Sequence, residues 1–153
     1  VCVQAMQAAA SPHHFLGIDG EGRTAVVRTR GNRLGHVILR GGRQPNFDPE
    51  SVAQCQQALR DNNLNTAVMI DCSHANSGKD PARQPDVARA AAAQRRAGNR
   101  EVIGIMLESN LIGGNQALST DRATLRYGQS VTDACMDWNE TEKLLRELSA
   151  ALA

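Results

Sequence analysis

Two short apolar segments stand out against polar surroundings and predict buried β-strands. Residues Ala67–Ile70 and Val102–Leu107 are continuous apolar runs bounded by polar residues, as in strands of a parallel sheet that are covered on both faces. A shorter run, His36–Leu39, follows the turn signal Gly31-Asn32 and predicts another strand. Polar side chains follow each run, so chemistry is expected at the strand ends.

Apolar residues with helical spacing predict three helices after these strands. They cover residues 48–61, with Asp48 or Ser51 as the cap, residues 81–97, opened by Pro81 or Pro85, and residues 139–152, opened by Asn139. The residues expected on the inward faces of the first and last helices are Val52, Cys55, Leu59, Leu144, Leu145, Leu148 and Leu152.

The first forty residues predict a helix followed by an excursion of β-structure. In residues 1–10, Val3, Met6 and Ala10 share one helical face. His14–Ile18 and Thr24–Thr29 read as strands, and we expect residues 24–39 to form a β-hairpin. Because the helical pattern is already present at the first residue, which is not Met, we interpret the chain as the interior of a longer protein.

The order of these elements is strand, helix, strand, helix, strand, a long polar loop over residues 109–135, and helix. This order is typical of α/β proteins with parallel strands. Three such units do not close a barrel, since a (β/α)₈ TIM barrel takes about 250 residues. We therefore expect residues 1–153 to be the carboxyl-terminal part of one barrel domain, with an inserted β-hairpin and with the amino-terminal half absent.

Composition narrows the possible functions. The chain has 153 residues, a net charge of +1 and 3% aromatic residues, so it lacks the basic surface and stacking platforms of a nucleic-acid-binding protein. No apolar run approaches the roughly 18 residues of a membrane span, and no signal peptide is evident. The four cysteines form no paired spacing, which favours the cytoplasm.

Three side chains that follow apolar runs or lie in polar loops form a candidate metal site: His74, Glu108 and Asp133. One imidazole and two carboxylates suit a divalent ion of the Mn, Fe or Co class. Each residue also has a simpler interpretation. His74 can be a hydrogen-bonded surface residue, Glu108 can pair with Arg40, and Asp133 can form an Asx-turn or a cap.

Arg40 ends the predicted strand His36–Leu39 and precedes two glycines that let a ligand approach the backbone. A guanidinium there can bind phosphate or carboxylate through two hydrogen bonds. The alternative is a structural ion pair with a carboxylate at the sheet edge. Cys72 is interpreted as an ordinary buried thiol.

Several longer motifs carry a resemblance to a known family. They are GHVILRGG, PNFD, MIDCSHANSGKD, GIMLESNL, GGNQ and YGQSVTDACMDW. Together they closely resemble the carboxyl-terminal half of the class I 3-deoxy-D-arabino-heptulosonate 7-phosphate (DAHP) synthases, nearly from end to end of the chain.

This resemblance implies a barrel enzyme that condenses phosphoenolpyruvate with erythrose 4-phosphate, the first step toward chorismate and the aromatic amino acids. It implies that His74, Glu108 and Asp133 bind the divalent metal and that Arg40 grips phosphoenolpyruvate. Arg40, His74 and Asp133 are then expected to bind substrate and act in catalysis, with Asp133 and His74 orienting or deprotonating a water. The full-length enzyme is expected to be a homo-oligomer.

The resemblance also implies regulation by an aromatic amino acid, and the sequence departs from the family pattern at two segments. Phe15 and Gly17 match the region where an aromatic amino acid inhibits the family, and the residues around them favour tyrosine. The Gly-Pro-Cys-Ser segment that supplies a fourth metal ligand is missing, as is the Lys-Pro-Arg-Thr segment for phosphate. We therefore expect the chain alone to be inactive. Cys135 is expected near the metal site, where it can react with another thiol.

Two rival interpretations remain at this point. The first is a non-catalytic half-barrel that binds a metal or a partner chain through exposed edge strands at 14–18 and 102–107. The second is another metal-dependent barrel enzyme, an aldolase or hydrolase, that uses the same His, Glu and Asp.

Overall fold

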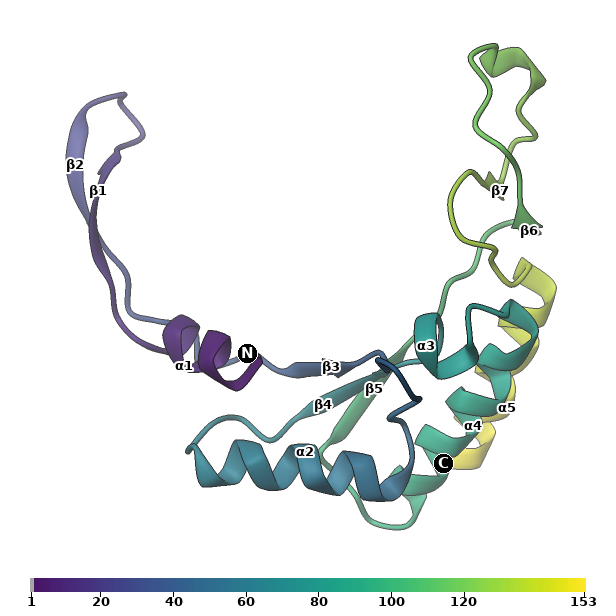
Figure 1. Cartoon of the computed structure of the whole chain (residues 1–153), viewed down its shortest axis with the longest axis horizontal. Coiled ribbons are helices and arrows are strands. Elements are labelled where there is room, and N and C mark those ends of the chain that lie inside the picture. Colours follow the sequence, from purple (N-terminus) through teal and green to yellow (C-terminus); the bar gives the residue numbers. More distant parts are fainter. Residues whose placement is uncertain (1) are drawn as a thin grey trace.

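The computed structural model describes residues 2–153, and Val1, the first residue of the predicted amino-terminal helix, lies outside the described residues. The elements alternate between strands and helices as expected for an α/β protein (Figure 1). They are α1 Cys2–Ala10, β1 His14–Ile18, β2 Thr24–Arg28, β3 Val37–Leu39, α2 Pro49–Asp61, β4 Val68–Asp71, α3 His74–Ser77, η1 Pro81–Arg83, α4 Gln84–Arg96, β5 Val102–Met106, β6 Ile112–Asn115, η2 Arg122–Thr124, β7 Gln129–Ser130 and α5 Trp138–Leu152.

The centre of the fold is a parallel sheet of three strands in the order β3-β4-β5. Leu39 lies opposite Ile70, and Ile70 lies opposite Ile105. All three strands therefore end at one edge of the sheet, and the segments that leave them carry the candidate site residues.

Helices α2, α4 and α5 cover one face of this sheet (Figure 1). The two fully buried aliphatic side chains of β4 pack in one core with Val52 and Leu59 of α2, which are also fully buried, as the helical spacing predicted. In α5, Leu144 and Leu148 are buried, but Leu145 and Leu152 are about half exposed, so the predicted apolar stripe was too wide.

The amino-terminal caps of α2 and α5 follow from local side-chain hydrogen bonds. Asp48 accepts the backbone N–H of Ser51 at 2.8 Å, so the predicted Asp48 cap is confirmed. In α5, Asp137 accepts the N–H of Glu140 at 2.8 Å. The helix therefore starts earlier than the predicted Asn139, because an acidic cap outcompetes the later amide.

The opposite face of the parallel sheet is open. Ile38 of β3, which lies on this face opposite Met69, is 51% exposed, and Met69 lies opposite Gly104 of β5. Since β3 and β5 are the two outer strands, the expected edge at 102–107 is confirmed. The expected edge strand at 14–18 is also confirmed, but it belongs to a separate sheet of two strands, in which β1 pairs with β2.

The predicted hairpin over residues 24–39 is also wrong. The hairpin is β1–β2, with His14 opposite Arg28 and Ile18 opposite Thr24, and Figure 1 shows it projecting away from the parallel sheet. The chain leaves it at Gly31, with φ of +77°, and the N–H of Asn32 bonds to Ala9 of α1 at 2.7 Å. The segment after the hairpin thus runs back past α1, and the following strand β3 pairs with β4 instead of with β2.

The long segment 109–135 is more ordered than a loop. β6 and β7 pair in parallel, with Ile112 opposite Gln129, and the short helix η2 lies between them. Among residues 2–153, every helix is too short or too polar to cross a lipid bilayer.

Candidate metal centre

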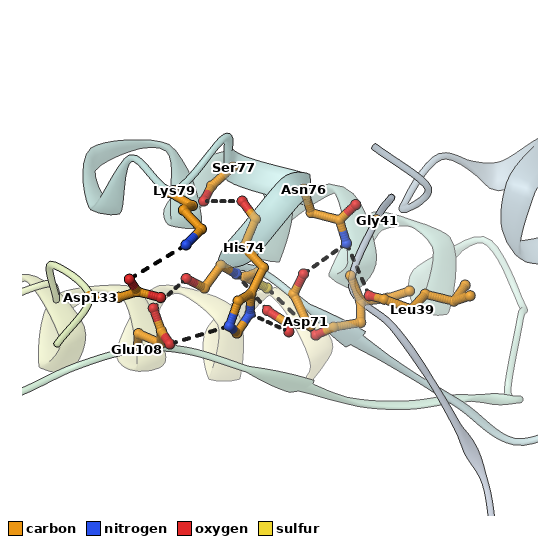
Figure 2. Close-up of polar contacts among 12 residues, drawn as sticks. Leu39, Gly41, Asp71, His74, Asn76, Ser77, Lys79, Glu108 and Asp133 are labelled. Carbon is orange, nitrogen blue, oxygen red and sulfur yellow. Dashed lines mark hydrogen bonds and ion pairs between the residues drawn. The ribbon is translucent and has the colours of Figure 1, made fainter. Parts of the chain in front are cut away.

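The three predicted metal-binding residues lie together at the carboxyl edge of the sheet. Figure 2 shows His74 turned toward Glu108, with Asp133 beside them. One donor atom from each of the three residues lies within 4.8 Å of the other two. They come from the β4–α3 junction, the end of β5 and the segment after β7, so the fold joins positions 59 residues apart.

His74 is held in place by the strand that precedes it. Its Nδ1–H donates to Oδ2 of Asp71, the last residue of β4, at 2.7 Å, and its Nε2 lies 3.6 Å from Oε1 of Glu108. His74 has a φ of +47°, a backbone conformation that is uncommon outside glycine and is often found at functional sites. The side chain of His74 is only 19% exposed, so it is not the surface histidine of the simpler interpretation.

Glu108 is fixed through both its side chain and its backbone. The Ser73 hydroxyl donates to Oε2 of Glu108 at 2.6 Å. The buried amide of Gln84 donates to the Glu108 carbonyl at 3.1 Å and accepts its N–H at 2.8 Å. The alternative pairing with Arg40 is wrong, because within residues 2–153 Glu108 forms no ion pair with Arg40, and its Oε1 lies 3.6 Å from Nε2 of His74 instead.

Asp133 lies in the segment that leads from β7 to α5. Its side chain is about half exposed, and Oδ1 lies 3.6 Å from Nζ of Lys79. The segment is tied back to Glu108, since the Met136 N–H donates to the Glu108 carbonyl at 3.0 Å, and the Asn110 N–H donates to the Met136 carbonyl. The position of Asp133 thus depends on Glu108, and its contact is with Lys79 instead of the Asx-turn of the simpler interpretation.

These residues fit a divalent metal ion. Two donors on opposite sides of a first-row ion lie about 4.2 Å apart, because each bond is about 2.1 Å. The observed 4.8 Å spread requires only a small inward movement. Glu108, Asp133 and the nearby Asp71 outnumber Lys79, so the surroundings are negative and attract a cation.

Arg40 lies at the same edge, next to Asp71, because it directly follows Leu39, which pairs with Ile70. It is exposed, and within residues 2–153 it forms no ion pair. Of the two glycines that follow Arg40 and were expected to let a ligand approach, Gly42 has open space beside it, whereas Gly41 does not. A Cβ at Gly41 would come within 2.7 Å of the Cβ of Ala75, so the chain itself fills that space.

The two cysteines near the site behave differently. Cys72 is fully buried, as predicted, and this burial, with a smaller effect from Asp71, raises the pKa of its thiol to about 12. Cys135 is partly buried, and burial together with the charges of Glu108 and Asp133 raises its pKa. Both thiols are therefore protonated at neutral pH.

The predicted effector residues lie elsewhere. Phe15 and Gly17 are in β1, on the projecting hairpin (Figure 1). Phe15 is about half exposed and lies opposite Val27. A Cβ at Gly17 would meet the Val27 side chain at 2.8 Å, which accounts for a glycine at this position.

Sequence reasoning gave no role to several residues that build the site. Asp71, Ser73 and Gln84 lie in or near the family motifs, yet their contacts with His74 and Glu108 were not anticipated. A carboxylate at a strand end, three residues before a candidate histidine ligand, is a usable signal, because ligating histidines commonly bond a carboxylate through their second nitrogen. No local signal identifies Gln84.

Comparison with known proteins extends these observations. The model of the DAHP synthetase I family matches residues 1–146. The Tyr-sensitive phospho-2-dehydro-3-deoxyheptonate aldolase of Enterobacter agglomerans is 53% identical over 95% of the chain and 68% of its own length. The Tyr-sensitive aldolase of Escherichia coli (strain K12) is 51% identical over 95% of the chain and 41% of its own length.

A solved structure agrees with the fold. The phospho-2-dehydro-3-deoxyheptonate aldolase from Francisella tularensis SCHU S4 superposes with a TM-score of 0.87 at 46% identity. It covers 98% of the chain, and the chain covers 43% of it. The chain thus spans about two fifths of this protein and of the Escherichia coli relative.

Proposed function

Because the chain belongs to the DAHP synthetase I family, we propose that it supplies part of the active site of a DAHP synthase. The reaction joins phosphoenolpyruvate, D-erythrose 4-phosphate and water to give DAHP and inorganic phosphate, the first step of the shikimate pathway. The observation that carries the proposal is the convergence of His74, Glu108 and Asp133. The enzymatic names of the relatives favour this function over the non-catalytic half-barrel.

In this proposal, His74, Glu108 and Asp133 hold a divalent ion of the Mn, Fe or Co class. When bound, the ion supplies Lewis-acid polarisation of the sugar aldehyde that C3 of phosphoenolpyruvate attacks. Asp133 is the most exposed of the three side chains. Asp133 is therefore the ligand best placed to orient the water that adds to C2 or to take its proton, and His74 is proposed to help orient this water.

Arg40 binds the anionic groups of phosphoenolpyruvate in this proposal. Two features support the role: its guanidinium is exposed, and no acidic side chain within the described residues neutralises it. It lies at the same sheet edge as the metal centre. A guanidinium there offers two parallel hydrogen bonds, which fix the orientation of the substrate before reaction.

We further propose that residues 1–153 are the carboxyl-terminal part of a single (β/α)₈ barrel. The open apolar face of the sheet and the share of the relatives that the chain spans support this. A barrel completed by other strands would also provide the fourth metal ligand and the phosphate contacts. For this reason we expect residues 1–153 alone to be inactive.

Regulation and cellular setting complete the proposal. Tyrosine is the favoured inhibitor, bound near Phe15 and Gly17, since both curated relatives above carry "Tyr-sensitive" in their names. The complete enzyme is proposed to be a homo-oligomer in the cytoplasm. The four cysteines are all free, which is usual in a reducing compartment.

The test is an assay of phosphoenolpyruvate consumption by the gene product that contains this chain, with erythrose 4-phosphate and Mn²⁺. His74→Ala and Glu108→Ala should abolish metal-dependent turnover, whereas His36→Ala, which changes an exposed histidine, should not. Full activity in His74→Ala would exclude the metal assignment.

A separate arm of the assay addresses Arg40. Arg40→Ala should raise the KM for phosphoenolpyruvate by about 10- to 100-fold, the equivalent of a lost charge-assisted hydrogen bond. Arg43→Ala, which removes an exposed arginine three residues away, is the matched control. A KM that stays at the wild-type value in Arg40→Ala would remove Arg40 from the substrate site.

A further inference from the structure

Behind the metal centre lies a buried carboxylate for which neither the motifs nor the comparisons provide a role. Asp71 is only 2% exposed, and a buried charge is costly unless it is paired and hydrogen-bonded. Both of its oxygens are occupied: Oδ1 accepts the Ser73 N–H at 2.9 Å, and Oδ2 accepts Nδ1–H of His74 at 2.7 Å (Figure 2). The carboxylate therefore contacts His74 but not the open side of the site.

This arrangement fixes the protonation of the neutral His74 ring. A carboxylate offers no proton, so Nδ1 must carry the hydrogen and Nε2 must present its lone pair. Nε2 is the nitrogen that faces Glu108, at 3.6 Å. A ring with its hydrogen on Nε2 could not bind an ion between His74, Glu108 and Asp133.

We infer that Asp71 is the positioning residue of the metal centre, which holds His74 in the tautomer and orientation that bind the ion. The inference rests on the proposed function, because it concerns the same three ligands. It adds a residue that touches neither metal nor substrate and acts only through His74. Hydrogen bonds of this kind to ligating histidines typically change metal affinity by about 10- to 100-fold.

Asp71→Asn separates this role from a purely structural one. In the variant, the carboxamide oxygen can still accept the Ser73 N–H, so the local backbone keeps its hydrogen bond. The NH₂ group then faces Nδ1 of His74 and donates to it, which moves the ring hydrogen to Nε2. The same reversal follows when the aspartate of a catalytic triad is replaced by asparagine.

The experiment uses the native gene product that contains this chain, labelled with ¹⁵N-histidine and free of metal, at a pH where the imidazoles are neutral. The His74 signal is identified by its absence in His74→Ala. Nitrogen shifts should report hydrogen on Nδ1 in the wild type and on Nε2 in Asp71→Asn. Calorimetric titration should show Mn²⁺ binding about 10- to 100-fold weaker in Asp71→Asn, and unchanged in Asp86→Asn, which alters an exposed aspartate of α4.

Two results would overturn the inference. One is a wild-type His74 with its hydrogen on Nε2, which needs no variant to observe. The other is an Asp71→Asn protein that keeps the hydrogen on Nδ1 and binds Mn²⁺ with wild-type affinity. If His74→Ala loses Mn²⁺ binding while Asp71→Asn retains it, only this inference fails; if His74→Ala also retains it, the proposed metal centre fails as well.

Discussion

At the scale of single residues, burial decides how the acidic and thiol groups around the site behave. The buried Asp71 has compensating contacts, because both of its oxygens accept hydrogen bonds. Cys72, its neighbour, has only a weak contact of its sulfur with the Ile70 carbonyl at 3.8 Å. The thiol is therefore stable only in its neutral form, and this has a measurable effect on stability.

The stability of the protein should fall at alkaline pH because of Cys72. Its pKa is raised from about 9 to about 12 by burial, so the unfolded chain loses this proton first. Below pH 9 the two states bind it equally. Between pH 9 and pH 12 the unfolded state is increasingly favoured, by up to about 1.4 kcal/mol per pH unit from this group.

Urea unfolding at pH 8 and pH 10.5 measures this effect. Cys72→Ala should lower stability at pH 8 through the cavity it leaves, yet lose less on going to pH 10.5 than the wild type. Cys2→Ala, at an exposed position, should follow the wild-type pH dependence. Parallel curves for Cys72→Ala and the wild type would contradict the prediction.

At the scale of elements, helix α4 determines where β5 ends. Gln84, at the start of α4, is fully buried and bonds both the N–H and the C=O of Glu108. Just beyond the end of β5, the side-chain amide of Gln84 thus makes the pair of hydrogen bonds that the backbone of a neighbouring strand would otherwise make. It fixes the backbone of a proposed metal ligand without contacting the metal.

Gln84→Ala should therefore affect both stability and metal binding. It leaves the Glu108 N–H without its partner in a largely buried setting, which costs about 1–3 kcal/mol. Mn²⁺ affinity should also fall, because Glu108 is no longer held in register. Gln54→Ala is the control, since Gln54 is an exposed helical glutamine that bonds only Glu50.

Urea unfolding and Mn²⁺ titration on the same two variants provide the measurement. We expect Gln54→Ala to remain within about 0.5 kcal/mol of the wild type, as is usual for surface substitutions. If Gln84→Ala behaved like Gln54→Ala in both experiments, the hydrogen-bond pair at Glu108 would not be what positions it.

At the scale of the whole molecule, the parallel sheet could be predicted from the sequence. The place of the hairpin and the pairing of β6 with β7 could not. The apolar runs around β4 and β5 marked buried strands because a short, continuous apolar run between polar residues is typical of a strand covered on both faces. The hairpin was misplaced because Asp19-Gly20 and Gly31-Asn32 are equally good turn signals, and only the contact of Asn32 with α1 decides between them. Parallel pairing of β6 with β7 depends on contacts between distant segments.

The residues of the candidate site also divide into those that the sequence predicted and those that it did not. His74, Glu108 and Asp133 were identified because each is a chemically capable residue near a strand end or in a polar loop, and the motifs agreed. Asp71 and Gln84 were missed since their roles depend on which atoms they meet after folding. Sequence patterns thus indicated the groups that would face a bound ion, whereas the groups behind them depend on contacts that form only on folding.

The open sheet face leads to a prediction about the isolated chain. Residues 1–153 expressed alone should self-associate, because Ile38 exposes an apolar side chain on this face beside unpaired strand edges. Ile38→Lys should reduce this association by placing a charge on the open face of the outer strand β3. Size-exclusion chromatography with light scattering measures the change, and a discrete wild-type monomer would contradict it.

In the complete gene product, the same substitution should be harmful to stability. If the proposed barrel covers this face, Ile38→Lys should destabilise that protein by several kcal/mol, since it buries an unpaired charge. Lys143→Ile is the control variant. It exchanges the same two residue types in the reverse direction, at an exposed position of α5 that lies away from the open sheet face.

The close approach of Gly41 to Ala75 restricts how this protein can diverge. Position 41 has a φ of +76° and no room for a methyl group, so neither site can enlarge while the other remains as it is. Steric contact between positions 41 and 75 therefore couples the loop that follows Arg40 to the turn that contains His74. Simultaneous randomisation of both codons should return almost only glycine at 41, accompanied by the smallest residues at 75.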